Sequence, residues 1–140
     1  MSTSTAPLFP WSDAYSVKIG VMDTQHKVLV ELINELHQAM VTGRGKEHLG
    51  GILSNLIKYT KSHFSAEEGL MQSNQYPEFT RHRAEHDRFS ATVQEFQDKF
   101  QKNEVVLTMD VMDFLKEWLS KHIMGVDKRY APHLHAKGVH

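Results

Sequence analysis

The sequence predicts an all-α protein, an up-down-up-down four-helix bundle preceded by an irregular N-terminal arm. Four long segments repeat apolar residues at steps of three and four, and no segment alternates apolar and polar residues as a strand does. Short turns join these segments, which favours antiparallel neighbours, and the near-3.5 spacing fits helices crossing at about 20°. We therefore expect 140 residues in one domain, with the arm at about 1–20, the bundle at about 21–128, and a short C-terminal tail.

The arm contains Pro7, Pro10 and Gly20 and lacks helical periodicity. Asp23 or Thr24 can cap a first helix that ends before the glycines at 43–45. Its inward stripe comprises His26, Leu29, Ile33, Leu36 and Met40.

A second helix is expected over about 46–73, with a turn at 74–77 in which Pro77 suits the first position of the next helix. The third helix has a stripe at 4-3-4-3-4 spacing, and Asn103 or Thr108 can cap the fourth. From about Arg129 onward, Pro132 and Gly138 predict a loosely ordered tail. The third stripe comprises His82, His86, Phe89, Val93, Phe96 and Phe100, and the fourth Val111, Leu115, Trp118 and His122.

Composition excludes several classes of function. The formal net charge is -1, which gives no electrostatic reason to expect a nucleic-acid partner. Without cysteine there can be no disulfide, iron–sulfur cluster or thiolate site. No apolar run approaches the roughly 20 residues that span a bilayer, and residues 1–11 do not resemble a secretory signal. We expect a cytoplasmic protein without membrane insertion and, because no exposed apolar stripe argues for self-association, a monomer.

Six polar side chains occupy inward positions otherwise filled by apolar residues. Burying each without a partner costs about 1–3 kcal/mol, so together they would consume most of the roughly 5–15 kcal/mol that stabilises a domain. They must therefore satisfy one another or bind a metal. They are His26, His63, Glu67, His82, His86 and His122.

Their spacing supports a metal site. His63 and Glu67, like His82 and His86, are four residues apart and project from one helix face about 6 Å from each other. Asp127 lies five residues after His122, about 140° away on an ideal helix. For Asp127 to join the site, the chain near Gly125 must loosen, for example through a π-turn.

Seven ligands exceed the four of a tetrahedral zinc site, and bridging carboxylates suit a pair of hard cations. Two six-coordinate ions that share two carboxylates and one solvent-derived oxygen would leave one coordination position open.

These residues fall into motifs that resemble the hemerythrin family, and within it the single-domain bacteriohemerythrins, over about residues 11–130. The motifs are Trp11, Asp23-x-x-His26, His63-Phe64-x-x-Glu67-Glu68-x-x-Met71, Tyr76-Pro77, His82-x-x-x-His86, and Trp118-Leu119-x-x-His122-Ile123-x-x-x-Asp127-x-x-Tyr130.

The resemblance implies a centre of two iron ions (Fe2+/Fe3+) joined by Glu67, Asp127 and an oxo or hydroxo bridge. His82, His86 and His122 would fill one iron, while His26 and His63 would leave the other open for O2. O2 would take two electrons from the ferrous pair and a proton from the bridging hydroxide, becoming bound hydroperoxide, and release would reverse both transfers. The O2 pocket would be an apolar wall of Leu29, Phe64, Trp118, Leu119, Ile123 and Met124. Met124 stands where animal members tend to have Leu, and Met is more flexible and more easily oxidised.

The implied function is reversible O2 binding for carriage, storage or delivery to an O2-consuming enzyme, and not catalysis. Two carboxylates donate less negative charge than the four of ferritin-like di-iron oxygenases, which favours stopping at peroxide. The alternatives are a di-iron scavenger of peroxide or NO, an oxidase, or an O2 or iron sensor that acts through a separate partner. Glu68 is expected to be exposed, with a role behind the ligands as the alternative. The other histidines are expected at the surface: His37, His48, His133, His135 and His140.

Overall fold

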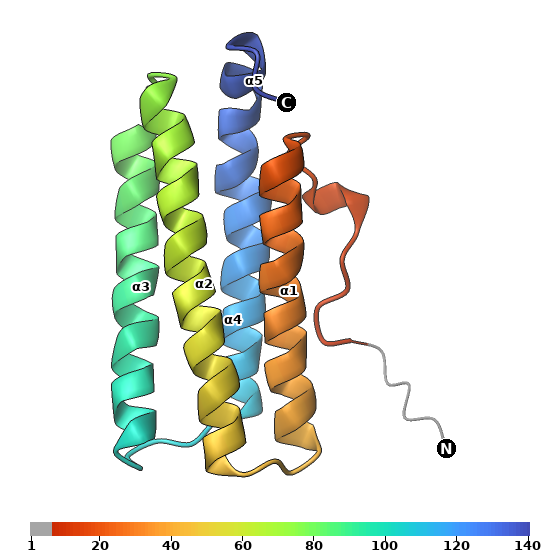
Figure 1. Ribbon diagram of the computed structural model, residues 1–140, viewed down its shortest axis with the longest axis vertical. Coiled ribbons are helices and arrows are strands. Elements are labelled where there is room, and N and C mark those ends of the chain that lie inside the picture. Colours follow the sequence, from red (N-terminus) through yellow and green to blue (C-terminus); the bar gives the residue numbers. More distant parts are fainter. Residues whose placement is uncertain (1–6) are drawn as a thin grey trace.

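A computed structural model describes residues 7–140, and four long helices make up most of it. These are α1 (Gly20–Val41), α2 (Lys46–Ser73), α3 (Phe79–Gln101) and α4 (Met109–His122). They lie side by side with nearly parallel axes, and consecutive helices run in opposite directions (Figure 1). No strand occurs in residues 7–140. The predicted four-helix bundle is confirmed, while the predictions for residues 1–6 lie outside the described residues.

Two helix starts differ from the prediction. The first helix begins at Gly20, ahead of Asp23, because the Asp23 carboxylate is used to hold the arm: it accepts from Ser16 Oγ at 2.6 Å and from Val17 N at 2.8 Å. The third helix begins at Phe79, two residues after Pro77. The fourth is capped as predicted by Thr108, whose side chain accepts from Val111 N.

The arm is irregular, as predicted, except for a short 3-10 turn, η1 (Asp13–Tyr15), yet it packs closely against α1. Phe9 is fully buried, and the Asn34 side chain accepts from its N–H at 2.8 Å and donates to its carbonyl at 2.9 Å. With the contacts of Ser16 and Val17 to Asp23, the arm thus lies along α1 on both sides of the first predicted ligand, His26.

The prediction of a loosely ordered tail is wrong. A π-helical segment, η2 (Ile123–Asp127), leads into α5 (Lys128–Ala136), which continues the line of α4 (Figure 1). Tyr130 and Leu134 are buried, four residues apart on one face, and this apolar spacing outweighs the helix-breaking tendency of Pro132.

Two tail histidines fasten α5 to the rest of the protein. His133 Nε2 donates to the carbonyl of Asn74 at 2.6 Å, and His135 Nε2 donates to that of Lys18 at 2.8 Å. Both are half-buried, as is His37, while His48 and His140 are exposed, so none of the five histidines expected at the surface is buried.

The interior has two regions. Apolar side chains fill the half near the α1–α2 turn, and the predicted ligands gather in the other half, where α1 and α3 begin and α2 and α4 end. None of the described helices is both long enough and apolar enough to cross a membrane.

Candidate metal centre

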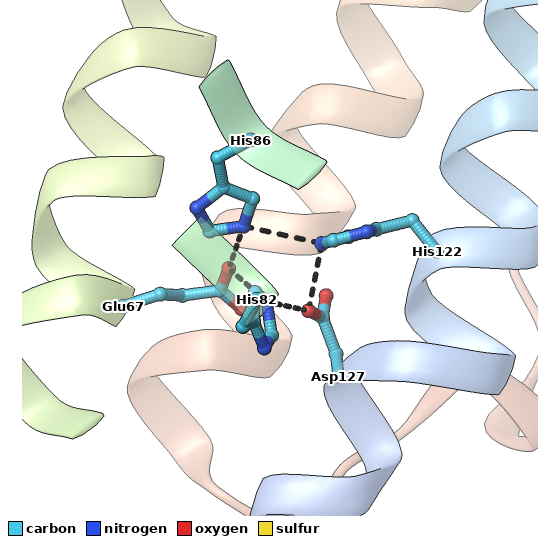
Figure 2. A group of neighbouring side chains, drawn as sticks. All are labelled: Glu67, His82, His86, His122 and Asp127. Atoms are coloured by element: carbon cyan, nitrogen blue, oxygen red, sulfur yellow. Dashed lines mark hydrogen bonds and ion pairs between the residues drawn. The ribbon is translucent and has the colours of Figure 1, made fainter. Parts of the chain in front are cut away.

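All seven predicted ligands lie together inside the bundle. Each is at most 2% exposed. They come from α1, α2, α3, α4 and η2. Figure 2 shows five of them pointing toward one another, namely Glu67, His82, His86, His122 and Asp127.

The ligand atoms form two groups that share both carboxylates. In each group one atom from every side chain lies within 4.8 Å of the others. The three-histidine group is Glu67, His82, His86, His122 and Asp127, and the two-histidine group is His26, His63, Glu67 and Asp127. Shared carboxylates between two unequal sets of imidazoles are suited to a bridged pair of ions.

Asp127 spans the two groups with its two oxygens. Oδ1 lies 2.9 Å from His82 Nε2 and 3.0 Å from His122 Nε2, while Oδ2 lies 3.0 Å from His26 Nε2. The π-helical turn brings the carboxylate inward, because its wider turn compensates for the five-residue spacing from His122. The predicted π-turn is confirmed.

Glu67 spans the groups from the opposite side. Its Oε1 lies 3.2 Å from His86 Nε2 and 3.4 Å from His63 Nε2, and its Oε2 lies 3.2 Å from His26 Nε2. Tyr130 donates from its hydroxyl to the same Oε2 at 2.6 Å and so fixes the carboxylate from behind.

The close contacts do not satisfy the hydrogen-bonding capacity of these atoms. Buried atoms without a hydrogen-bond partner include Glu67 Oε1, both Asp127 oxygens and His82 Nε2. Unpaired buried polar groups are costly and rare, and here they converge on one small volume. Cations at this point would satisfy them together, so the donor set fits a pair of metal ions.

Three ligand histidines are held from behind by a side-chain oxygen. His63 Nδ1 contacts Gln25 Oε1 at 2.7 Å, and two carboxylates hold the others. Glu68 Oε2 lies 2.9 Å from His86 Nδ1 and Glu85 Oε1 lies 2.8 Å from His122 Nδ1.

These outer contacts fix the tautomer of each neutral ring. An oxygen accepts, so Nδ1 carries the proton and Nε2 presents a lone pair to the interior. His86 Nε2 and His122 Nε2 lie 3.1 Å apart, so two lone pairs would face each other unless a proton or a metal ion lies between them. This geometry independently supports a metal site.

Sequence reasoning missed Gln25 and Glu85, and it was wrong to expect an exposed Glu68, whose side chain is only 22% exposed. Each of the three directly precedes or follows a ligand along the chain, as Gln25 precedes His26. Each supports a ligand on another helix, however, and that pairing is tertiary.

Protons compensate the buried charges when no metal is bound. Burial alone would lower the pKa of His26, but its contacts with Asp127 and Glu67 raise that pKa to about 10. For His122, the charge of Asp127 and the contact with Glu85 outweigh burial and likewise raise the pKa to about 10. Burial would raise the pKa of Glu67 and Asp127, yet the nearby imidazoles hold both pKa values well below their ordinary range. Metal ions would therefore compete with protons for this site.

The predicted pocket residues divide into two sets. Leu29, Phe64, Trp118 and Leu119 line one apolar cavity with about 20 Å³ of space, room for roughly one molecule the size of water. Ile123 is fully buried but does not line the cavity.

Met124 does not belong to this wall, and its prediction is corrected. It is 44% exposed, because the π-turn directs Ile123 and Asp127 inward and leaves Met124 and Gly125 between them exposed. The concern that a flexible, oxidisable Met loosens the wall therefore falls away.

Two wall residues also brace ligand rings. The Phe64 ring stacks on His86 at 3.7 Å between centroids with an interplanar angle of 1°, and Trp118 stacks on His122 at 4.5 Å and 13°. Aromatic packing thus restricts both rings of the three-histidine group that carboxylates hold from behind.

A bundle in which all four helices contribute to a carboxylate-bridged, histidine-rich pair of metal sites defines a class of di-metal protein. Comparison with known proteins identifies the family within that class. The profile of the hemerythrin HHE cation binding domain matches residues 17–134. The chain belongs to the hemerythrin family.

Several relatives match over most of their length. A bacteriohemerythrin of Methylococcus capsulatus is 38% identical over 130 residues, which cover 92% of this chain and 98% of the relative. A bacteriohemerythrin of Pseudomonas aeruginosa is 38% identical over 122 residues, covering 86% and 77%. A crystal structure of wild-type hemerythrin superposes with a TM-score of 0.87 at 37% identity and covers 91% of this chain and 98% of the other.

Proposed function

We propose that this protein binds O2 reversibly at a di-iron centre held by His26, His63, Glu67, His82, His86, His122 and Asp127. The supporting observation is the unequal pair of ligand groups. Three imidazoles could serve one ion and two the other, and both carboxylates belong to both groups. The ion with two imidazoles has one protein ligand fewer and is the one at which O2 would bind.

When bound, a pair of ferrous ions supplies two electrons and a position for O2. The chain's own residues keep that position specific. Apolar side chains line a cavity whose residues Phe64 and Trp118 stack on the rings of His86 and His122, and they would keep water from this end of the site. The Tyr130 hydroxyl holds Glu67 Oε2 in place. Burial and the charges of Glu67 and Asp127 raise the pKa of Tyr130 well above 10, so its hydroxyl remains a donor at neutral pH.

The cavity wall favours binding over turnover. Apart from the indole of Trp118, the described polar side chain in this wall is Thr60, whose hydroxyl donates to the carbonyl of Leu56 at 2.7 Å. With this hydroxyl occupied, the described wall of the cavity itself offers no general acid or base. This supports a binding protein without catalytic function. Delivery of O2 to an O2-consuming enzyme, a cytoplasmic location and a monomeric state stay predictions.

The test is cyclic exposure of iron-loaded protein to O2. Protein reduced without air should develop a visible absorption band on exposure to O2 and lose it on purging with argon, over repeated cycles. His63→Ala should abolish the band, whereas the matched variant His37→Ala, on α1 outside the site, should retain it. Irreversible oxidation on first exposure, with peroxide released to solution, would instead favour a scavenger or an oxidase.

A further inference from the structure

The two ligand groups differ in the charge behind their imidazoles. In the three-histidine group, two rings are backed by carboxylates, with Glu68 behind His86 and Glu85 behind His122. In the two-histidine group the one backing side chain is the Gln25 amide, behind His63. The remaining ring of each group, His82 or His26, has no hydrogen-bond partner at Nδ1 among the described residues.

This difference affects how strongly each ring donates electrons. A carboxylate that accepts from Nδ1–H draws the proton away and makes the imidazole a stronger donor at Nε2, whereas an amide oxygen has no net charge and acts more weakly. Stronger donation favours the higher oxidation state of a bound metal, and hydrogen bonding behind the ligands is one means by which proteins set metal potentials.

The positions of Glu68 and Glu85 suit a role in setting the reduction potential of a bound metal. The His86 and His122 side chains are each 1% exposed, whereas those of Glu68 and Glu85 are 22% and 28% exposed. Partial contact with solvent reduces the cost of maintaining a charge there, while the buried imidazole carries the effect into the centre. Glu68 also lies 3.9 Å from Arg83 Nε, an ion pair that offsets part of its charge, whereas the charge of Arg88 acts on Glu85 without forming an ion pair, so Glu85 should have the larger effect.

We propose that Glu68 and Glu85 are positioning residues that stabilise the oxidised state of the ion held by His82, His86 and His122, and that the neutral Gln25 leaves the other ion easier to reduce. The inference rests on the proposed iron centre. It implies that the first electron given to the oxidised pair resides on the two-histidine ion, where O2 would bind.

The test compares reduction potentials in iron-loaded variants. Glu85→Gln and Glu68→Gln each remove a charge but keep an oxygen that can accept from Nδ1–H. Gln25→Glu adds a charge behind His63. Glu95→Gln is the matched control, because Glu95 is on the same helix as Glu85, 73% exposed, about 15 Å further along, and its loss changes the net charge equally.

Spectroelectrochemical titration without O2 should show a higher midpoint potential in Glu85→Gln. We expect at least a tenfold change in the reduced-to-oxidised ratio at fixed potential, about 59 mV for a one-electron step. Glu68→Gln should shift less in the same direction, Gln25→Glu should lower a midpoint, and the control should match the parent.

A purely structural role for these contacts would leave the potentials unchanged, since each variant keeps its hydrogen bond. Potentials of Glu85→Gln and Gln25→Glu that both equal the control's would overturn the proposal. If Glu85→Gln does not load iron, the midpoint potential of Gln25→Glu decides: a lower potential than the control's supports the proposal, and an equal or higher one overturns it. These titrations contain no O2, so they remain decisive even if the loaded protein fails to bind O2 reversibly and the proposed function is wrong.

Discussion

Replacing Tyr130 with Phe tests whether the bridging carboxylate is held from outside the ligand set. The substitution removes one oxygen from a side chain that is 1% exposed and that donates to Glu67 Oε2 at 2.6 Å. The ring remains, including its stacking on His82 at 5.7 Å and 18°. Only the hydrogen bond is lost.

The magnitude follows from the kind of bond. A distance of 2.6 Å is typical of a hydroxyl donating to a charged oxygen, and such bonds contribute about 1.5–3 kcal/mol to stability. Because Glu67 is fully buried, no water can take the place of the lost donor without rearrangement. We expect the free energy of unfolding to fall by about 1.5–3 kcal/mol, equivalent to roughly 2–4 °C in Tm for each kcal/mol.

Urea denaturation of the metal-free and iron-loaded proteins provides the measurement. Tyr59→Phe is the matched control, since Tyr59 is half-buried and its hydroxyl makes no hydrogen bond within residues 7–140. We expect the control to lie within about 0.5 kcal/mol of the parent. If Tyr130→Phe is no less stable than Tyr59→Phe in either state, the Tyr130 hydroxyl does not hold Glu67 and the reasoning fails.

Three further predictions concern the buried charges and the C-terminal end. In metal-free protein, His26 and His122 have pKa values of about 10 against 6.5 when unfolded, so their stabilisation is complete below about pH 6.5 and is lost as the pH rises through 10. Urea denaturation with a chelator present should give a free energy of unfolding that falls between pH 7 and 10, and a flat profile would contradict the assignment. Leu134→Ala should lower the free energy of unfolding by about 2–5 kcal/mol in the same assay, with Lys137→Ala at an exposed position as its control. If Leu134→Ala is as stable as the control, α5 does not contribute to the core and the tail is loosely ordered after all. Gly125→Ala should retain full iron loading and change stability by about 1 kcal/mol or less, and loss of iron would show that the π-turn requires glycine.

The ligand set was predictable because burial of polar groups has a large cost. A histidine at an inward position such as His26 or His122 must have a partner, and six such positions at helical spacing leave few arrangements, whereas Asp127 was added by the family resemblance and the expected π-turn. The bounds of α2, expected at about 46–73 and observed at Lys46–Ser73, and the Thr108 cap of α4 were also predictable from the sequence. Both signals lie within single segments of the chain.

The predictions were wrong where the role of a side chain depended on contacts between separate segments of the chain. Asp23 looked like a helix cap but is used by Ser16 and Val17 of the arm. Glu68 looked exposed on its own helix, yet α3 places the ring of His86 against it. Contacts of this kind, between residues of different segments, leave no periodic pattern in the sequence. They become visible only once the helices are packed together.

The π-turn depends both on the local sequence and on contacts between segments. An α-helix continued through 123–127 would direct Asp127 away from the interior, and Gly125 suggested a flexible backbone as the cause of the deviation. In the structure Gly125 lacks a left-handed conformation, and a Cβ added to it would meet no atom within 4 Å. The conformational freedom of Gly125 is therefore not the cause of the π-turn. Asp127 is fully buried between imidazoles of α1, α3 and α4, and immediately beyond it Tyr130 and Leu134 anchor α5 in the core. The wide turn is the conformation that allows the carboxylate to reach the imidazoles and α5 to pack at the same time, so the contacts of Asp127 and the burial of α5 in the apolar core together offset its energetic cost.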